Sequence, residues 1–553
     1  MRQRASALSA DATNSAVVAG WTLVSRASGL ARVVLVGAVL GPTFLTNIFL
    51  STSVVPNLVY TTIAGPVLGM VVVPAVVRAL AADGPEQALK LLSQITGYLL
   101  RIAGVVMGML LIASPGIAWL LTAGMPDPAA RGRGLLLTVL LLALVAPQVV
   151  LYMLAGVATA AQQVQGRFAL AAGAPALENV GLIATLAFVV LTQSTDVDTA
   201  NAPLGLVIIL GAGNTLSVGL HAAAQLWGAA RAGMPVRPRL GGRSDPIAAE
   251  TAKRIRASLP VAANPALAYF GRLAVAATVP GGVFVLQASY SIYNVPTALG
   301  AKAVSSAALP GLSRAAAAHD APGYASSWRQ AAMYVGIVGL PAMALLLAYA
   351  HPIAEILSAG KLQSAEIIES FAGSVAVLGV AQLVAGVHEI TRQALFARIE
   401  VDAPRRASMT YLAVSAVSAG AALLVPAGLP RLIALSVTVL LSDFAAAAVV
   451  IARLRKVIAP ERFLDVRRQV VVLVATVAMA PALLVSWAFS RDPAHGVFSE
   501  IALVAAGSVV ALACYVLALR VGFGRPRGTS GELETAGGAG SDASSDQATR
   551  RET

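Results

Sequence analysis

Charged side chains are scarce in this sequence, and their scarcity excludes most soluble folds. Only 12% of the 553 residues are Asp, Glu, Lys or Arg, whereas about 25% is usual for a soluble domain. The single cysteine, Cys514, excludes a disulfide framework within the chain and a metal cluster built on several cysteines. The five scattered histidines argue against a catalytic metal site. No GxxxxGK[ST] loop is present, so we do not expect ATP to drive the protein directly.

Apolar sequence is what the chain has in abundance. Hydrophobic residues make up 57% of it, and the mean hydropathy is +0.78. A membrane span needs roughly 20 mostly apolar residues. Ala, Leu and Val dominate without strand-like alternation, which predicts helices and an all-α polytopic membrane protein. The sequence predicts fourteen spans, at 16–40, 44–72, 97–121, 135–160, 170–191, 204–229, 258–279, 282–310, 331–350, 371–395, 407–425, 430–451, 469–489 and 499–519.

The charge that is present is basic, with a formal net value of +13. With the N-terminus inside, most of the 39 Lys and Arg residues fall in loops on the inner side, as the positive-inside rule requires. The polar N-terminus is predicted to be an uncleaved cytoplasmic head, and the C-terminus also lies inside. The basic segments 231–256 and 453–468 are therefore expected to set topology and contact anionic lipid, rather than nucleic acid.

The two halves of the sequence share a Pro–Arg pair with the same spacing. Pro74 precedes Arg78 by four residues, and Pro310 precedes Arg314 by the same spacing. A repeat with an even number of spans keeps its orientation, and this build suits alternating access around a central cavity. The predicted organisation is an N-terminal lobe of helices 1–6 (1–230), a basic cytoplasmic linker (231–257), a C-terminal lobe of helices 7–12 (258–452), helices 13–14 (453–520) and a disordered cytoplasmic tail (521–553).

Cations inside spans are costly and mark candidate functional positions. Arg26 and Arg32 lie six residues apart in the first span, so their facings differ by about 120°. Both can border one broad cavity, although Arg26 can also reach the cytoplasmic interface. Arg272 holds the matching place in the seventh span and is expected to face the cavity. Lys302 is either a cavity cation or extends to an interface.

Acids inside spans are fewer. Glu178 and Asp443 are candidates for carrying a coupling proton, or for a hydrogen bond between helices. Glu389 and Arg392 lie three residues apart on one helix and are expected to neutralise each other. A cationic cavity implies an anionic substrate, which residue types leave open between a lipid-linked phosphate and a soluble organic anion.

Several segments resemble the MurJ/MviN-type lipid II flippases of the multidrug/oligosaccharidyl-lipid/polysaccharide (MOP) exporter superfamily, namely 25–58, 165–182, 294–314 and 395–408. The resemblance covers nearly all of 14–520. It implies two six-helix lobes and a last helix pair that shapes a groove for a lipid tail. It also implies a non-enzymatic monomer in the bacterial cytoplasmic membrane that serves peptidoglycan synthesis, cell-wall biogenesis and cell shape. Such a protein flips a lipid-linked peptidoglycan precursor to the outer leaflet, coupled to membrane potential, H⁺ or Na⁺.

The resemblance also assigns individual residues, with departures. Arg26 and Arg32 match the two first-helix arginines thought to hold the pyrophosphate. Tyr60 and Thr61 replace arginines of the second helix, and Lys302 stands where an apolar residue is expected. Asn47 stands where an Asp is usual and Ser291 where an Arg is expected. The predicted substrate-binding residues are Arg26, Arg32, Asn47, Arg272, Ser291 and Lys302, with Glu178 and Asp443 for ion coupling and no metal or cofactor.

Other functions remain open at this point. One is a flippase for another polyprenyl-linked oligosaccharide. Another is a cation-coupled multidrug or small-anion antiporter of the same superfamily, although its cavity should hold acids and aromatics, and only 5% of the chain is aromatic. A third is a membrane scaffold that recruits cell-wall enzymes through its basic loops and tail. The expected partners are a polyprenyl-pyrophosphate-linked sugar and the lipid bilayer, with cell-wall synthesis machinery in the scaffold alternative.

Overall fold

The computed structural model describes residues 2–63, 68, 72–239, 262–490 and 497–524, and every regular element in those ranges is helical. The first half contains α1 (Arg2–Leu40), α2 (Phe44–Ile63), α4 (Val73–Thr122), α5 (Pro128–Val145), α6 (Gln148–Val164), α7 (Ala169–Gly173), α8 (Pro175–Thr192) and α9 (Leu204–Arg231). The second half contains helical residues 262–276, α11 (Gly282–Thr297), η3 (Ala298–Lys302), α12 (Ala303–Ala317), α13 (Ala321–Ala348), α14 (Ala350–Leu357), η4 (Gly360–Leu362), α15 (Ala365–Ala397), α16 (Asp402–Ala422) and α17 (Leu429–Ile458). It is followed by α18 (Val466–Val477), α19 (Ala480–Ser490) and α20 (Val497–Phe523).

Ten helices in the described residues are long and apolar enough to cross a membrane, and each overlaps one of the predicted spans over most of its length. The predicted spans 44–72 and 258–279 lie partly outside the described residues. The span 282–310 is divided by the π-turn Ala298–Lys302. The span 407–425 falls in α16, which begins with Asp402 and carries two arginines in its first turns. The all-helical membrane fold is therefore confirmed, while the total of fourteen stays a prediction.

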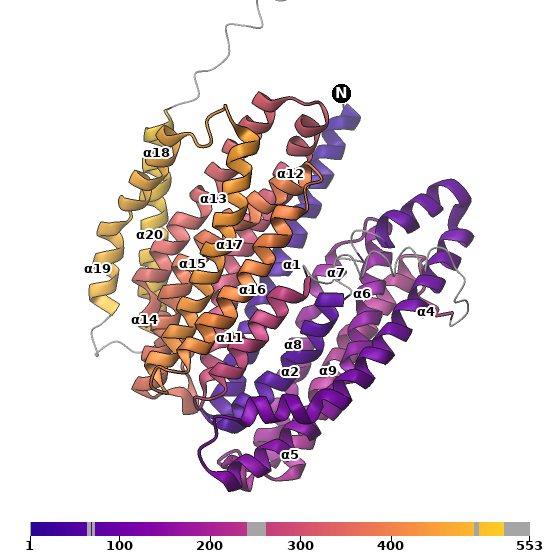
Figure 1. The fold of residues 1–553 in the computed structure, drawn as a ribbon, viewed down its shortest axis with the longest axis vertical. Helices are drawn as coiled ribbons and strands as arrows, with labels where there is room; N and C mark the ends of the chain where they lie inside the picture. Colours follow the sequence, from indigo (N-terminus) through magenta and orange to yellow (C-terminus); the bar gives the residue numbers. More distant parts are fainter. Residues whose placement is uncertain (1, 64–67, 69–71, 240–261, 491–496, 525–553) are drawn as a thin grey trace, which may run out of the picture.

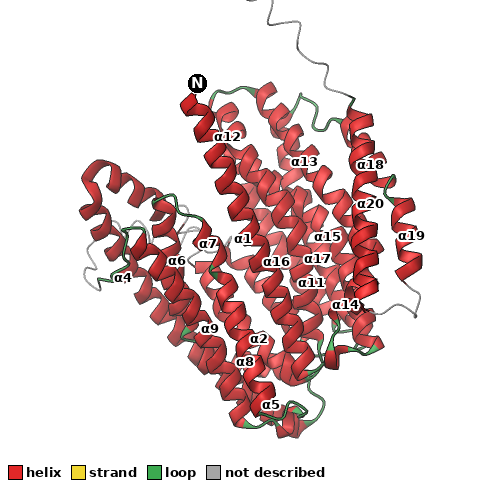
Figure 2. Ribbon diagram, turned by 180° about the vertical axis from the view of Figure 1, so that it is seen from behind, coloured by secondary structure: helices red, strands yellow, loops and turns green. Residues whose placement is uncertain are grey.

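The helices form two groups (Figures 1 and 2). We call α1–α9 the N-lobe, and residues 262–276 with α11–α17 the C-lobe. The groups lie close together at the end where α5 and α14 are found and diverge toward the opposite end. Helix α1 contacts α7 and α8 of its own lobe as well as α11 of the other. Helices α18–α20 lie along the outer side of the C-lobe, beside α13 and α14. A residue on α1 can therefore face either lobe.

Left-handed turns recur at corresponding places in the two lobes. Gly41 has a φ of 75° after α1, and Gly281 has a φ of 70° after the helix at 262–276. Arg32 lies nine residues before the first of these glycines, and Arg272 lies nine residues before the second. The predicted equivalence of the two arginines in the repeat thus has a backbone counterpart.

The Pro–Arg pairs that signalled the repeat also share one hydrogen bond. The Nε of Arg78 donates to the carbonyl of Pro74 at 3.2 Å, and the Nε of Arg314 donates to the carbonyl of Pro310 at 3.3 Å. Both arginines are exposed. We call the end of the molecule that carries them the basic end.

Two of the predicted segments, the linker 231–257 and the tail 521–553, lie mostly outside the described residues.

At the opposite end, which we call the joined end, the lobes are hydrogen-bonded to each other. The side-chain amide of Asn47 donates to the carbonyls of Val279 (2.7 Å) and Ala277 (3.3 Å), and its oxygen accepts from the backbone N–H of Val283 (3.1 Å). Asn47 is 1% exposed. Because an unpaired buried backbone group costs about 1–3 kcal/mol, one amide that serves three such groups ties α2 firmly to the C-lobe.

Two further contacts reinforce the joined end. The amide of Gln287 donates to the carbonyl of Leu50 at 3.0 Å. The ammonium of Lys361 donates to the carbonyl of Thr195 at 2.6 Å and lies 3.7 Å from the carboxylate of Asp196. The conformation is therefore one in which the lobes are linked at the end away from Arg78 and Arg314.

Candidate functional site

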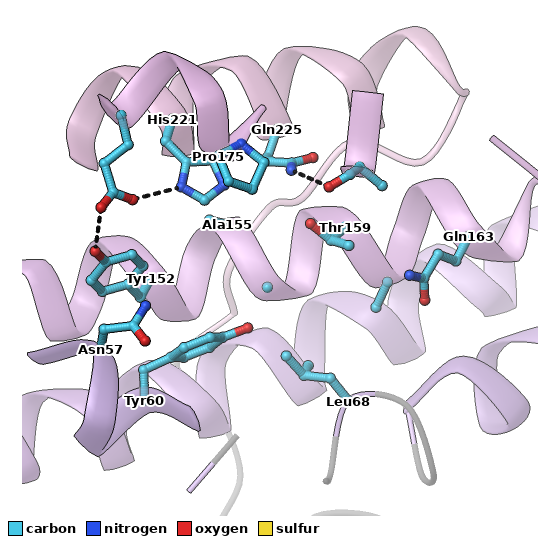
Figure 3. A pocket seen from close by; sticks show the side chains of 14 residues that line it. Asn57, Tyr60, Leu68, Tyr152, Ala155, Thr159, Gln163, Pro175, His221 and Gln225 are labelled. Atoms are coloured by element: carbon cyan, nitrogen blue, oxygen red, sulfur yellow. Dashed lines mark hydrogen bonds and ion pairs between the residues drawn. The ribbon is translucent and has the colours of Figure 1, made fainter. Parts of the chain in front are cut away.

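A cavity of about 420 Å³ opens inside the N-lobe, between α2, α6, α8 and α9 (Figure 3). Its lining combines aromatic, amide and ionisable side chains, including Tyr60, Tyr152, Gln163, Glu178, His221 and Gln225. Tyr60 and Tyr152 stack with their ring centres 5.8 Å apart and form one wall. The sequence identified Tyr60 only as the replacement of an arginine, whereas the structure shows that it also lines this cavity.

Glu178 is the centre of the polar network in this cavity. One carboxylate oxygen accepts from the guanidinium of Arg32 (3.1 Å) and from the hydroxyl of Tyr152 (2.9 Å), and the other lies 3.3 Å from Nδ1 of His221. The bonds from Tyr152 and His221 are the dashed lines that meet at this carboxylate in Figure 3. Three helices, α1, α6 and α9, therefore converge on a single acid of α8.

Local packing fixes where that acid lies. The amide of Asn179, next to Glu178, donates to the hydroxyl of Ser28 at 2.9 Å and so holds α8 against α1. At Gly181 a methyl group would lie 2.7 Å from the hydroxyl oxygen of Ser217, which shows that a glycine is needed for α8 and α9 to approach this closely. Sequence reasoning missed Tyr152 and His221, although a histidine inside a predicted span was an available signal.

Arg26 faces a different neighbourhood from Arg32. It is exposed and lies within electrostatic range of Lys302, which also interacts with Glu389 and Arg392 on α15. The ion pair between Glu389 and Arg392, 2.6 Å long, confirms the predicted pairing. Lys302 is placed by the π-turn at Ala298–Lys302, and π-turns often occur at functional sites. Arg26, Lys302, Glu389 and Arg392, which we call the inter-lobe cluster, carry a positive excess contributed by both lobes.

Arg272 lies inside the C-lobe. It is 1% exposed, donates to the hydroxyls of Ser415 (2.8 Å) and Tyr411 (3.1 Å), and its guanidinium lies 5.7 Å from the ring centre of Tyr290. The structure does not support the expectation that Arg272 faces a cavity between the lobes, because α11 and α16 enclose it. Its partners are hydroxyls and aromatic rings, and no carboxylate of the described residues lies within ion-pair distance of it.

The other predicted residues also have protein partners. Asp443 is 5% exposed, accepts from the hydroxyl of Tyr293 at 3.2 Å and lies 3.9 Å from Nδ1 of His388. The hydroxyl of Ser291 donates to the carbonyl of Gln287 in its own helix. Asn47 belongs to the joined end described above. Of the predicted set, Arg32 and Glu178 come together in the N-lobe, and Arg26 and Lys302 in the inter-lobe cluster. The described residues contain no group of His, Cys, Asp or Glu suited to a metal ion.

Comparison with known proteins decides the family. The model of the family "Lipid II flippase MurJ" matches residues 36–506. This chain belongs to the MurJ family. It is thus a multi-pass membrane protein of a family of flippases rather than of catalytic enzymes. The matched range begins after Arg26 and Arg32.

Solved structures share the fold of this MurJ-family chain. A structure of lipid II flippase MurJ in an inward closed conformation has a TM-score of 0.68 at 13% identity and covers 91% of this chain and 98% of its own. An inward-facing multidrug resistance MATE transporter of the MOP superfamily has a TM-score of 0.56 at 15% identity, covering 80% and 94%. A MOP superfamily transporter from Pyrococcus furiosus gives 0.51 at 14% identity, covering 80% and 95%. These likenesses confirm the architecture.

Proposed function

We propose that this protein flips a lipid-linked peptidoglycan precursor, a lipid II-like undecaprenyl-pyrophosphate sugar, from the inner to the outer leaflet of the bacterial cytoplasmic membrane. Membership of the MurJ family supports this function. The observation that carries it is the set of cations contributed by both lobes, with Arg26 and Arg32 on α1 and Lys302 beside α11. The guanidinium of arginine and the ammonium of lysine are the usual ligands of phosphate. A pyrophosphate held between the lobes can move when the lobes move.

Alternating access is the mechanism we propose. The joined end is closed by Asn47, Gln287 and Lys361, so this conformation admits substrate from the basic end. The positive-inside rule assigns the basic end to the cytoplasm, where the precursor is made available. Rupture of the joined end with approach of the lobes at the basic end would then expose the pyrophosphate to the other leaflet.

The lipid tail and the energy source complete the proposal. The last helix pair, formed by α18–α19 and by α20, exposes a large apolar surface. This surface includes Leu484, Phe498, Val509 and Leu517 and suits a polyprenyl chain that stays in lipid. Export of an anionic head is favoured by an inside-negative potential, by about 2.3 kcal/mol per charge per 100 mV. Membrane potential, H⁺ or Na⁺ is the energy source that we propose in place of ATP.

The decisive test is depletion of the protein in its source bacterium, with re-expression of variants. Depletion should cause polyprenyl-linked peptidoglycan precursor to build up on the cytoplasmic leaflet, and wild-type protein should clear it. The double variant Arg26→Ala/Lys302→Ala should clear it at least about tenfold more slowly, because it loses two charge-assisted contacts. A matched control is Arg329→Ala, since this half-buried arginine donates to the carbonyl of Arg462 and lies outside the inter-lobe cluster. Absence of any precursor build-up would refute the flippase function.

A second candidate is a flippase for another polyprenyl-linked oligosaccharide. Tyr60 and Ser291 favour it, because both stand where the family resemblance leads us to expect arginine. The stacked rings of Tyr60 and Tyr152 also offer a flat apolar wall of the kind that sugars contact. The same depletion separates the two candidates by the chemical identity of the lipid that accumulates.

A further inference from the structure

We propose that Glu178 is the internal counter-anion of Arg32, and that an anionic substrate head which takes over Arg32 causes Glu178 to bind a proton. The proposal rests on the proposed function, because it requires an anion that reaches α1. It assigns to the N-lobe cavity a protonation site linked to substrate binding. Substrate and proton then bind together, each favouring the other.

The contacts of Glu178 carry the proposal. The titratable groups that face its carboxylate are Arg32 from α1, Tyr152 from α6 and His221 from α9. Of these, Arg32 is the one permanent cation, and its side chain is 26% exposed while that of Glu178 is 11% exposed. The guanidinium therefore keeps donors within reach of a ligand, while the carboxylate behind it forms part of the cavity wall.

Electrostatics then links the two events. A carboxylate inside a membrane protein is stable in its ionised form when a cation neutralises it. A pyrophosphate oxygen that pairs with Arg32 competes for the same charge and places a second anion beside Glu178. The remaining partners, Tyr152 and His221, satisfy hydrogen bonds without supplying a fixed positive charge. Uptake of one proton removes the repulsion between the two anions, and loss of the substrate restores the Arg32–Glu178 pair and releases that proton.

The cavity offers a route for the proton. It is lined along α6 from Tyr152 to Gln163, which spans about 16 Å of helix toward the basic end. The amide and hydroxyl groups of Gln163, Thr159 and Gln225 line the same cavity and can bind water along that path. No oxidant, metal or cofactor is required, because the proton comes from and returns to water.

The test counts protons. Full-length protein in lipid nanodiscs is titrated calorimetrically with a short-chain prenyl-pyrophosphate sugar, whose diphosphate diester keeps a fixed charge between about pH 5.5 and about pH 8. Repetition in buffers of different ionisation enthalpy gives the number of protons bound with each probe molecule. We expect proton uptake that approaches one per probe molecule within this pH range for wild-type protein, and none for Glu178→Gln. The variant should also bind the probe about tenfold more tightly at about pH 8, because its Arg32 is already free.

A matched control is Glu400→Gln, which removes a carboxylate paired with Arg453 on α17, outside the cavity. Its proton count and affinity should equal those of wild-type protein. Binding of the probe by wild-type protein without proton uptake overturns this inference and leaves the proposed function standing. Failure of wild-type protein to bind the probe at any pH overturns both. If Glu178→Gln does not fold, the proton count of wild-type protein still decides.

Discussion

Two arginines at matching places in the repeat have opposite surroundings. Arg32 of the N-lobe pairs with a carboxylate and keeps about a quarter of its side chain exposed. Arg272 of the C-lobe is buried and bonds to the hydroxyls of Ser415 and Tyr411. A shared position in a repeat therefore fixes where an arginine lies in the fold, whereas the residues around it decide its role. The N-lobe arginine can exchange partners with a ligand, while the C-lobe arginine holds helices together.

The largest expected effect is on stability, from Arg272→Ala. Removal of a fully buried long side chain leaves a cavity and strands two hydroxyls, at a cost of about 3 kcal/mol. We expect the thermal unfolding midpoint of the detergent-purified variant to fall markedly below that of wild-type protein, and Arg32→Ala to lower it by less than half as much. Equal shifts for the two variants would contradict the division of tasks between the lobes.

The next effect is on binding, from Arg32→Ala. Loss of a partly exposed guanidinium that is paired with Glu178 should weaken binding of the prenyl-pyrophosphate sugar at least about tenfold. Arg32→Lys keeps the charge without the planar guanidinium, so its affinity for the probe should lie between those of wild-type protein and Arg32→Ala. Equilibrium binding in nanodiscs measures the series. A lysine variant as weak as the alanine variant would show that Arg32 acts by shape and not by charge.

A third prediction concerns the joined end, where the two lobes meet. Asn47→Ala leaves the backbone groups of Val279, Ala277 and Val283 without their partner, so the lobes should separate there about tenfold more often. Ser51→Cys, at a position 0% exposed in this conformation, reports the opening by its rate of maleimide labelling in a Cys514→Ser background. Labelling that does not depend on residue 47 would mean that the joined end is held elsewhere.

The smallest effect comes from a turn that both lobes share. Gly166 after α6 and Ile399 after α15 have φ values of 67° and 61°, and in both turns the next residue's N–H returns to the helix, to Gln162 and to Leu395. A left-handed backbone costs a residue with a side chain about 1 kcal/mol more than glycine. Ile399→Gly should therefore raise the unfolding midpoint and Gly166→Ala should lower it. Since a methyl group on Gly166 would meet nothing within 4 Å, only backbone strain is tested there.

Much of the fold could be predicted because its determinants are local. Ten spans, the repeat marked by Pro74 and Pro310, and the Glu389–Arg392 pair all follow from hydropathy or spacing within one segment. The different facings of Arg26 and Arg32 also follow, since helical phase depends only on residue number.

The partners of those residues could not be predicted. Asn47 was expected to bind substrate, but its bonds reach backbone groups about 230 residues away, and this depends on how two lobes meet. Tyr152 and His221 join Glu178 because α6, α8 and α9 cross at one level of the bundle. Hydropathy and spacing do not determine helix crossings between distant segments. The substrate site was therefore predicted as residue types, whereas its arrangement needed the structure.

The hydrogen bonds of Arg78 to Pro74 and of Arg314 to Pro310 have a mechanical consequence. In the proposed motion the basic end closes while the joined end opens, and Arg314 lies about 45 Å of helix beyond Val283, far from the joined end. Each Nε is tied to the backbone, and we expect the outer nitrogens of both guanidiniums to contact anionic lipid headgroups on the cytoplasmic side. The lobes approach each other at this end in the proposed motion, so headgroup composition should bias the balance between the two conformations.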